Sequence, residues 1–259
     1  MNDFSMMNPF LQSLLAGLFA FFLTSLGSAI IFLFQSVNQK IMNYMISLAA
    51  GIMLASSFFS LLNPAIDISS QIHQNRVLLF LGFLIGGGFL LFCNKVFKHF
   101  SFNQENNLNL KRCILLFTSI TLHNIPEGLA IGVAFGSTLY GNSLISAISL
   151  AFGIAIQNFP EGAAISLPMR KEGVSCFSSF LFGVLSGIVE PIFALVGALV
   201  VLKINIILPF ILSFAAGAMI YVTVLELIPE CLSLKNKDLT AFILLIGFSI
   251  MMFLEILLG

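Results

Sequence analysis

Long apolar runs with few polar interruptions alternate with short polar connections along the whole chain. Each run reaches about 20 residues or more, the length at which an α-helix crosses the roughly 30 Å hydrocarbon core of a bilayer. The pattern predicts eight transmembrane helices, at about 10–34, 42–66, 77–96, 113–135, 144–169, 176–202, 204–231 and 239–258. Because the connections are short, we expect a single transmembrane domain over residues 1–259.

The composition leads to the same fold class. Hydrophobic residues make up 59% of the chain and charged residues only 8%, which is more apolar surface than a soluble domain of this length can bury. We therefore predict an all-α integral membrane protein whose main surroundings are the lipid bilayer. No nucleic-acid partner is expected.

Lysine and arginine are distributed unequally between the two ends of the predicted helices. If the N-terminus lies outside, nine of them face the cytoplasm: Lys40, Lys95, Lys98, Lys111, Arg112, Arg170, Lys171, Lys235 and Lys237. Only Arg76 and Lys203 then lie on the other side. Cytoplasmic loops carry the excess of basic residues, so both termini are predicted on the extracytoplasmic side of the cytoplasmic membrane.

Two similar hexapeptides stand inside separate apolar runs, HNIPEG at 123–128 and QNFPEG at 157–162. A glutamate in hydrocarbon is costly and usually faces a cavity, a partner or an ion. His123 and Glu127 are four residues apart and share one helix face, and Gln157 and Glu161 repeat this spacing. The paired motif therefore predicts a polar site in the middle of the membrane.

The side chains of this site are those of a metal centre. Imidazole nitrogen, carboxylate and amide oxygens suit Zn²⁺, and also Fe²⁺, Mn²⁺ or Cd²⁺. A third acid, Glu190 in SGIVEPIFAL, could complete a second metal position next to Glu127 and Glu161. The candidate ligands are His123, Asn124, Glu127, Gln157, Asn158, Glu161 and Glu190. The alternative is a pair of proline kinks whose polar side chains, the amides above all, only join helices by hydrogen bonds.

The residues around each motif have structural roles of their own. Pro126 and Pro160 lack an N–H and displace the carbonyl four residues earlier, which at membrane depth must be satisfied by water, metal or a neighbouring helix. Gly128 and Gly162 follow each glutamate and are expected to allow close approach of another helix.

A second pair of segments suggests an internal repeat. AAGIM at 49–53 precedes LNP at 62–64, and AAGAM at 215–219 precedes LIP at 227–229. The predicted helices that carry them run in opposite directions, as do those of the two hexapeptides. Such similarity is typical of the inverted repeats of secondary transporters. Chance recurrence of small residues in membrane helices would explain AAGxM but not two copies of NxPEG.

Together these segments resemble the ZIP family of divalent-metal transporters, in particular its bacterial GufA-like branch. The resemblance is carried by HNIPEGLAIGVAFG, QNFPEGAAISLPMR, SGIVEPIFALVGA, GIMLASSFFSLLNPAI and AAGAMIYVTVLELIPE. It implies eight helices in a three-two-three arrangement and a binuclear metal centre on the fourth, fifth and sixth helices.

The resemblance also assigns ligands to two metal positions. It places His123, Glu127, Gln157 and Glu161 on one metal, and adds Asn124, Asn158 and Glu190 to the shared glutamates on the other. Family members often carry aspartate where Asn158 stands, so the second position of this chain lacks one negative charge.

Further residues are candidates for the pathway on either side of the centre. By resemblance, Asp67 is an acid at the entrance, and Met53 and Ser60 are pathway positions; a solvated helix-end charge, packing and an interhelical contact are the alternatives. Glu226 and Glu230, one turn apart towards the cytoplasm, suggest an inner exit, with an acid at the membrane interface as the alternative. We expect Glu255 at the opposite interface.

The function predicted is transport of divalent cations, Zn²⁺ before Fe²⁺, Mn²⁺ or Cd²⁺, across the cytoplasmic membrane. The resemblance implies uptake into the cytoplasm, homodimers and an elevator-like movement of one helix bundle against another. The metal is substrate, and no cofactor is expected. The alternative is an intramembrane metalloenzyme built on the same site, but HxxxE differs from the HExxH and di-iron motifs, so we predict that the chain is not an enzyme.

Overall fold

The computed structural model describes residues 2–33, 39–71, 75–102, 108–203, 207–232 and 237–258. The side chains of His123, Glu226 and Glu230 lie outside this description. The described residues form eight long helical segments and no strand, which confirms the all-α prediction. The segments are α2 (Pro9–Ser28) with α3 (Ile30–Leu33); α4 (Gln39–Ala55), η1 (Ser56–Leu62) and α5 (Asn63–Gln71); α6 (Val77–Phe102); α7 (Leu108–Ser137); α8 (Leu144–Lys171); α9 (Cys176–Gly187) with α10 (Val189–Lys203); α11 (Leu208–Val222), η4 (Thr223–Leu227) and α12 (Ile228–Cys231); and α13 (Lys237–Leu258).

Two short helices were not anticipated from the sequence, α1 (Asn2–Ser5) and η2 (Thr138–Tyr140).

Polar side chains mark where several long helices begin. Asn8 accepts a hydrogen bond from the N–H of Phe10 at the start of α2, and Ser143 accepts one from Ser146 at the start of α8. Such caps satisfy N–H groups that have no partner within the helix.

Seven helices of the described chain are long and apolar enough to cross a membrane. The seven spans are 9–33, 40–71, 77–96, 144–170, 176–201, 208–225 and 237–257. The eighth predicted span, 113–135, lies within α7, which carries the HNIPEG motif in its middle and is not among the seven. The chain is thus a multi-pass membrane protein.

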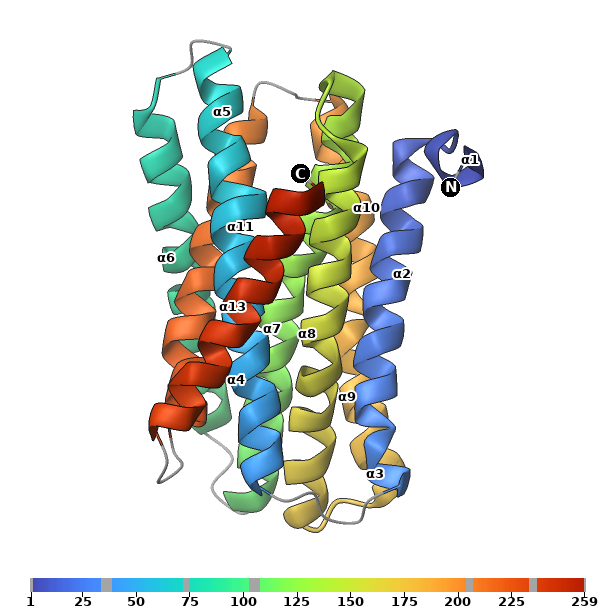
Figure 1. Cartoon of the computed structure of the whole chain (residues 1–259). Coiled ribbons are helices and arrows are strands. Elements are labelled where there is room, and N and C mark those ends of the chain that lie inside the picture. The colour runs from blue at the N-terminus through green and yellow to red at the C-terminus, as the bar shows by residue number, and fades with distance from the viewer. Residues whose placement is uncertain are drawn as a thin grey trace.

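The helices form two groups that lie side by side (Figure 1). In the first group, α2 packs on α8 and α9, and α10 packs on α7 and α2. In the second, α4 packs on α13, and α11 packs on α6, α5 and η1. The groups meet where α8 contacts α4 and where α7 contacts α11. Both described chain ends lie towards the same end of the bundle.

Within each group, glycines bring helix backbones into direct contact. A Cβ at Gly162 of α8 would overlap the carbonyl oxygen of Thr24 on α2, and one at Gly128 of α7 would lie 2.5 Å from the carbonyl oxygen of Glu190 on α10. The expected close approach at these two glycines is confirmed. Gly51 of α4 meets α13 in the same way, and Gly86 of α6 meets α11.

Wider π-helical turns interrupt the segments that carry the AAGxM pair. In η1 the N–H of Asn63 bonds to the carbonyl of Phe58, and in η4 the N–H of Ile228 bonds to that of Thr223, five residues back in both cases. Pro64 and Pro229 follow immediately, where a proline ring collides with the carbonyl four residues before it. The wider turn is the local means by which each helix continues through its proline.

Candidate metal centre

Three helices bring the motif residues together in the core of the first group. Asn124 and Glu127 lie on α7, Gln157 and Glu161 on α8, and Glu190 near the start of α10. All of these side chains are buried, as is Asn158, and only Glu161 reaches even 3% exposure. The helices continue through Pro126 and Pro160, so each motif stays helical. His123 lies on α7, but its side chain is outside the described residues.

Hydrogen bonds join these helices across the centre. The Nε2 of Gln157 donates to Oε1 of Glu127 at 2.5 Å, which links α8 to α7. The Nδ2 of Asn124 donates to the backbone carbonyl of Ser186 at 2.9 Å, which links α7 to α9. The amides therefore do act as interhelical contacts, as the alternative interpretation proposed, but each uses only its nitrogen to do so.

Glu190 is held from two sides. The Nδ2 of Asn158 donates to its Oε2 at 2.8 Å, and the hydroxyl of Thr24 donates to its Oε1 at 2.8 Å. Thr24 belongs to α2, is fully buried, and was not among the residues predicted from the sequence. Its hydroxyl also lies 3.2 Å from the carbonyl of Ala20. A threonine in an apolar helix usually bonds only to its own backbone in this way, so no local pattern singles it out.

Six oxygen atoms of the centre have no hydrogen-bond partner among the described residues. They are Oε2 of Glu127, both carboxylate oxygens of Glu161, Oε1 of Gln157, and Oδ1 of Asn124 and of Asn158. A buried carboxylate or amide oxygen without a partner is strongly destabilising. So many together, from the two helices α7 and α8, form a site suited to a positive charge.

The negative charges of the centre also favour the binding of a cation. Glu127, Glu161 and Glu190 are buried close enough together to repel one another. Within the described residues, no three carboxylate, histidine or cysteine side chains enclose an ion by themselves. A cation held here would therefore also need the amide oxygens, and the imidazole of His123 is the remaining predicted donor.

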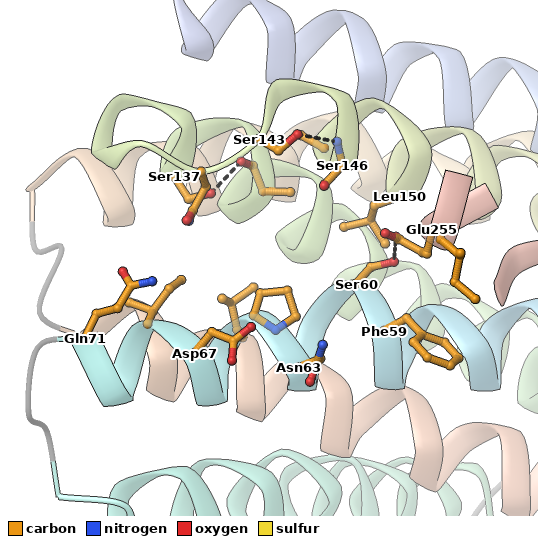
Figure 2. Close-up of a pocket in the computed structure, with 17 residues that line it drawn as sticks. Phe59, Ser60, Asn63, Asp67, Gln71, Ser137, Ser143, Ser146, Leu150 and Glu255 are labelled. Atoms are coloured by element: carbon orange, nitrogen blue, oxygen red, sulfur yellow. Dashed lines mark hydrogen bonds between the residues drawn. The ribbon is translucent and has the colours of Figure 1, made fainter. Parts of the chain in front are cut away.

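A cavity of about 500 Å³ opens from the end of the bundle near the chain termini (Figure 2). Asp67 and Asn63 of α5 line one wall, and serines of α7 and α8 line the opposite wall. Leu150 of α8 also lines the cavity, and Gln157 stands seven residues further along the same helix, roughly 10 Å deeper. Buried apolar side chains such as Ile154 and Met53 occupy the intervening part of the core.

The structure places the predicted pathway residues as follows. Asp67 is exposed and lines the cavity. Ser60 is nearly buried and its hydroxyl donates to Oε1 of Glu255 in the cavity wall. Glu255, which we expected at the interface, is only partly exposed, and its carboxylate accepts this hydrogen bond from a serine 195 residues away.

Met53 is packed in the core, where its sulfur accepts a hydrogen bond from Thr223 at 2.8 Å. Glu226 and Glu230 lie outside the described side chains, and the exit remains a prediction.

Comparison with known proteins decides the family. The sequence model of the ZIP zinc transporter family matches residues 107–255. The chain is 33% identical to zinc transporter ZIP11 of Xenopus tropicalis, over 97% of this chain and 98% of that protein. The chain belongs to the ZIP zinc transporter family. Bacterial relatives include zinc transporter ZIPB of Bordetella bronchiseptica, 33% identical over 95% of this chain and 81% of that protein. Zinc transporter GufA of Myxococcus xanthus is 32% identical over 84% and 87%.

Membership confirms the resemblance read from the sequence. This ZIP protein is a zinc transporter, and the alternative of an intramembrane metalloenzyme is set aside. The match to the family model begins before α7 and includes the whole of α7, α8 and α10, so the buried polar centre lies entirely within it.

Proposed function

We propose that this ZIP protein carries divalent cations, Zn²⁺ first and also Fe²⁺, Mn²⁺ or Cd²⁺, across the cytoplasmic membrane into the cytoplasm. The cation binds between α7 and α8 at Glu127, Gln157 and Glu161, with His123 as the further ligand and Asn124, Asn158 and Glu190 around it. The observation that carries this proposal is the set of six buried oxygen atoms that have no hydrogen-bond partner in the described part of the chain. A cation, or water on its way through, would satisfy several of these acceptors at once.

The amide ligands suit a site that must release its ion. Carboxylates attract a divalent cation strongly, whereas neutral amide oxygens bind it weakly. The NH₂ group of Gln157 donates to Glu127. Its Oε1 therefore points in another direction and has no hydrogen-bond partner among the described residues. The same hydrogen bond thus orients the amide oxygen, as outer contacts orient the ligands of metal sites.

Helix packing supports the three-two-three arrangement with an inverted repeat. If the first three spans correspond to the last three, and α7 to α8, the close pair α2–α8 corresponds to α10–α7. The close pair α4–α13 then corresponds to α11–α6. The π-helical turns of η1 and η4 also fall at matching places, each before a matching proline. An inverted repeat with its site where the halves meet is a common plan of secondary transporters.

Alternating access would then be a displacement of one helix group against the other. The hydrogen bonds of Glu190 lie within the first group, and those between Ser60 and Glu255 and between Thr223 and Met53 lie within the second. Leu150 and Ile154 of α8 and Ala215 and Met219 of α11 belong to one buried apolar cluster that extends over both groups. Aliphatic side chains of this kind can slide without breaking directed bonds, which favours the elevator-like movement.

The charge distribution and the position of the cavity support uptake into the cytoplasm. The positive-inside rule puts both termini outside, and the cavity opens at the end where the termini lie. The acids of the cavity would then face the extracytoplasmic side and collect cations for uptake. The homodimer and the inner exit at Glu226 and Glu230 remain predictions.

The direct test is uptake into proteoliposomes that contain the purified full chain. Radiolabelled Zn²⁺ is added outside, with and without competing Fe²⁺, Mn²⁺ or Cd²⁺, and with and without a pH gradient. We expect saturable uptake of zinc that the competing ions inhibit. Uptake no faster than in protein-free vesicles, for every ion tested, would contradict the proposal.

The cavity acids give a second expected result. Replacing Asp67 by asparagine and Glu255 by glutamine together should raise the KM for zinc about fivefold at low salt and leave kcat unchanged, because they concentrate cations before binding. The difference should shrink as salt screens the field. Asp238→Asn is the control, since Asp238 is an exposed acid at the other end of α13. A change in kcat alone, or an equal effect of the control, would argue against this role.

A further inference from the structure

The carboxylate of Glu190 has hydrogen-bond donors on both of its oxygens. Asn158 from α8 and Thr24 from α2 each donate to it at 2.8 Å, and all three side chains are buried. Glu127 and Glu161 differ in this respect. Within the described structure, Glu127 has one oxygen without a hydrogen-bond partner and Glu161 has two. The carboxylate oxygens that are free to bind a cation therefore belong to Glu127 and Glu161 and not to Glu190.

The orientation of the Asn158 amide follows from its partner. An ionised carboxylate only accepts hydrogen bonds, so the NH₂ group of Asn158 must face Glu190, because two oxygens in that position would repel. Its Oδ1 then points elsewhere, which agrees with that atom having no hydrogen-bond partner among the residues described. The amide thus supplies the positive side of a dipole at this place without any ion.

An aspartate at position 158 would behave in the opposite way. In the same rotamer it would bring a second carboxylate oxygen to the 2.8 Å at which the amide nitrogen now lies from Glu190. Two carboxylate oxygens in such contact need a proton or a cation between them. The asparagine removes that need.

The charges of the centre lead to the same result. Glu127, Glu161 and Glu190 are the buried carboxylates described here. With one divalent cation they leave one negative charge, and Glu190 has two donors to stabilise it. With two divalent cations they leave one positive charge in the membrane core, without an anion to offset it, which is strongly unfavourable. A fourth carboxylate at position 158 would balance two ions.

We propose that this chain binds one divalent cation at a time, with the Asn158 amide in the place of a second. This inference depends on the proposed transport site, and it replaces the two-metal centre that the family resemblance implies. Thr24 is its positioning residue, because it fixes the second oxygen of Glu190. Thr24 and Glu190 are 166 residues apart, the same separation as AAGIM and AAGAM, so they occupy corresponding places on the first and sixth spans.

The test is to count zinc ions bound per chain at saturation, by equilibrium dialysis of the purified full-length protein in lipid nanodiscs. The double variant Glu127→Ala/Glu161→Ala supplies the background from zinc bound elsewhere, such as at the cavity acids and cysteines. We expect the wild type to bind one ion more than this background, and Asn158→Asp to bind two more.

The possible outcomes separate the two proposals. Two ions above background in the wild type would overturn the inference without affecting the proposed transport site. One ion above background in a well-folded Asn158→Asp variant would overturn it as well, since Asn158 would not decide the number. Equal counts in the wild type and the double variant would mean that the transport site itself is wrongly placed, and both proposals would fall.

Thr24 is tested in the Asn158→Asp background. Thr24→Val keeps the shape of the side chain but removes its hydroxyl, and should raise the zinc concentration needed for the second ion by about tenfold, as losses of an outer contact usually do. Thr24→Ser keeps the hydroxyl and should restore binding. If the serine variant were as weak as the valine variant, the effect would come from packing, and Thr24 would have no positioning role.

Discussion

Zinc uptake should fall by more than about 100-fold when either Glu127 or Glu161 is replaced by alanine, a larger loss than removal of an outer contact causes. Among the described residues, one buried oxygen of Glu127 and both of Glu161 have no hydrogen-bond partner. The loss should not come from misfolding, because Glu161 has no hydrogen-bond partner among the described residues and Glu127 has only the amide of Gln157, while each variant also removes one of three carboxylates that repel one another. The measurement is the initial rate of zinc uptake into proteoliposomes.

Two further measurements make this prediction specific. Zinc should raise the melting temperature of the wild type, as any ligand of the folded state does, but not that of the variants. Thr121→Ala is a control on α7, since the Thr121 hydroxyl bonds only to the backbone carbonyl of Phe117 in its own helix, as far as the structure shows. Wild-type uptake by either glutamate variant would remove that carboxylate from the transport mechanism.

Replacing Gly86 by alanine should destabilise the protein by about 2 kcal/mol or more, within the usual range for overpacking. The new Cβ would overlap the carbonyl oxygen of Phe214, a backbone atom that cannot move aside without shifting α6 from α11. Thermal unfolding of the purified protein, followed by loss of the monodisperse peak on size-exclusion chromatography, measures the effect.

Gly88 provides a matched control two residues further along α6. A Cβ there would meet no atom within 4 Å, so Gly88→Ala should be neutral or stabilise the helix by up to about 1 kcal/mol. Both variants change helix propensity in the same way, and only one adds an atom to a helix contact. Equal melting temperatures for the two would show that the contact between α6 and α11 is not rigid.

Much of this architecture could be predicted from local sequence. A run of apolar residues long enough to span the bilayer forms a helix because its backbone has no other partner in hydrocarbon, and the described helices are of this kind. The paired NxPEG motifs also identified the residues that turn out to be buried together, since the i, i+4 spacing is a property of one helix. Gly128 and Gly162 were predicted correctly as close contacts for the same local reason.

The features that were missed depend on packing between distant segments. Thr24 donates to a residue 166 positions away, and Ser60, for which an interhelical contact was one of two interpretations, donates to a residue 195 positions away that was not identified as its partner. Nothing in the neighbourhood of a lone threonine or serine indicates such a partner, because small hydroxyl residues are common in membrane helices. The π-helical turns were also missed, although the prolines that follow them were noted as part of the repeat. The direction of the Asn158 amide required knowledge of what stands opposite it.

The glycine contacts between paired helices have a consequence for how this architecture persists through evolution. Where backbone meets backbone, the fit depends on the absence of a side chain and not on the identity of any neighbour, so the remaining faces of each helix are free to drift. Relatives that share only a third of their residues with this chain over nearly its full length are then compatible with one common scaffold. Selection would act on a few small residues at the crossings, and on the ligands that the scaffold holds in place.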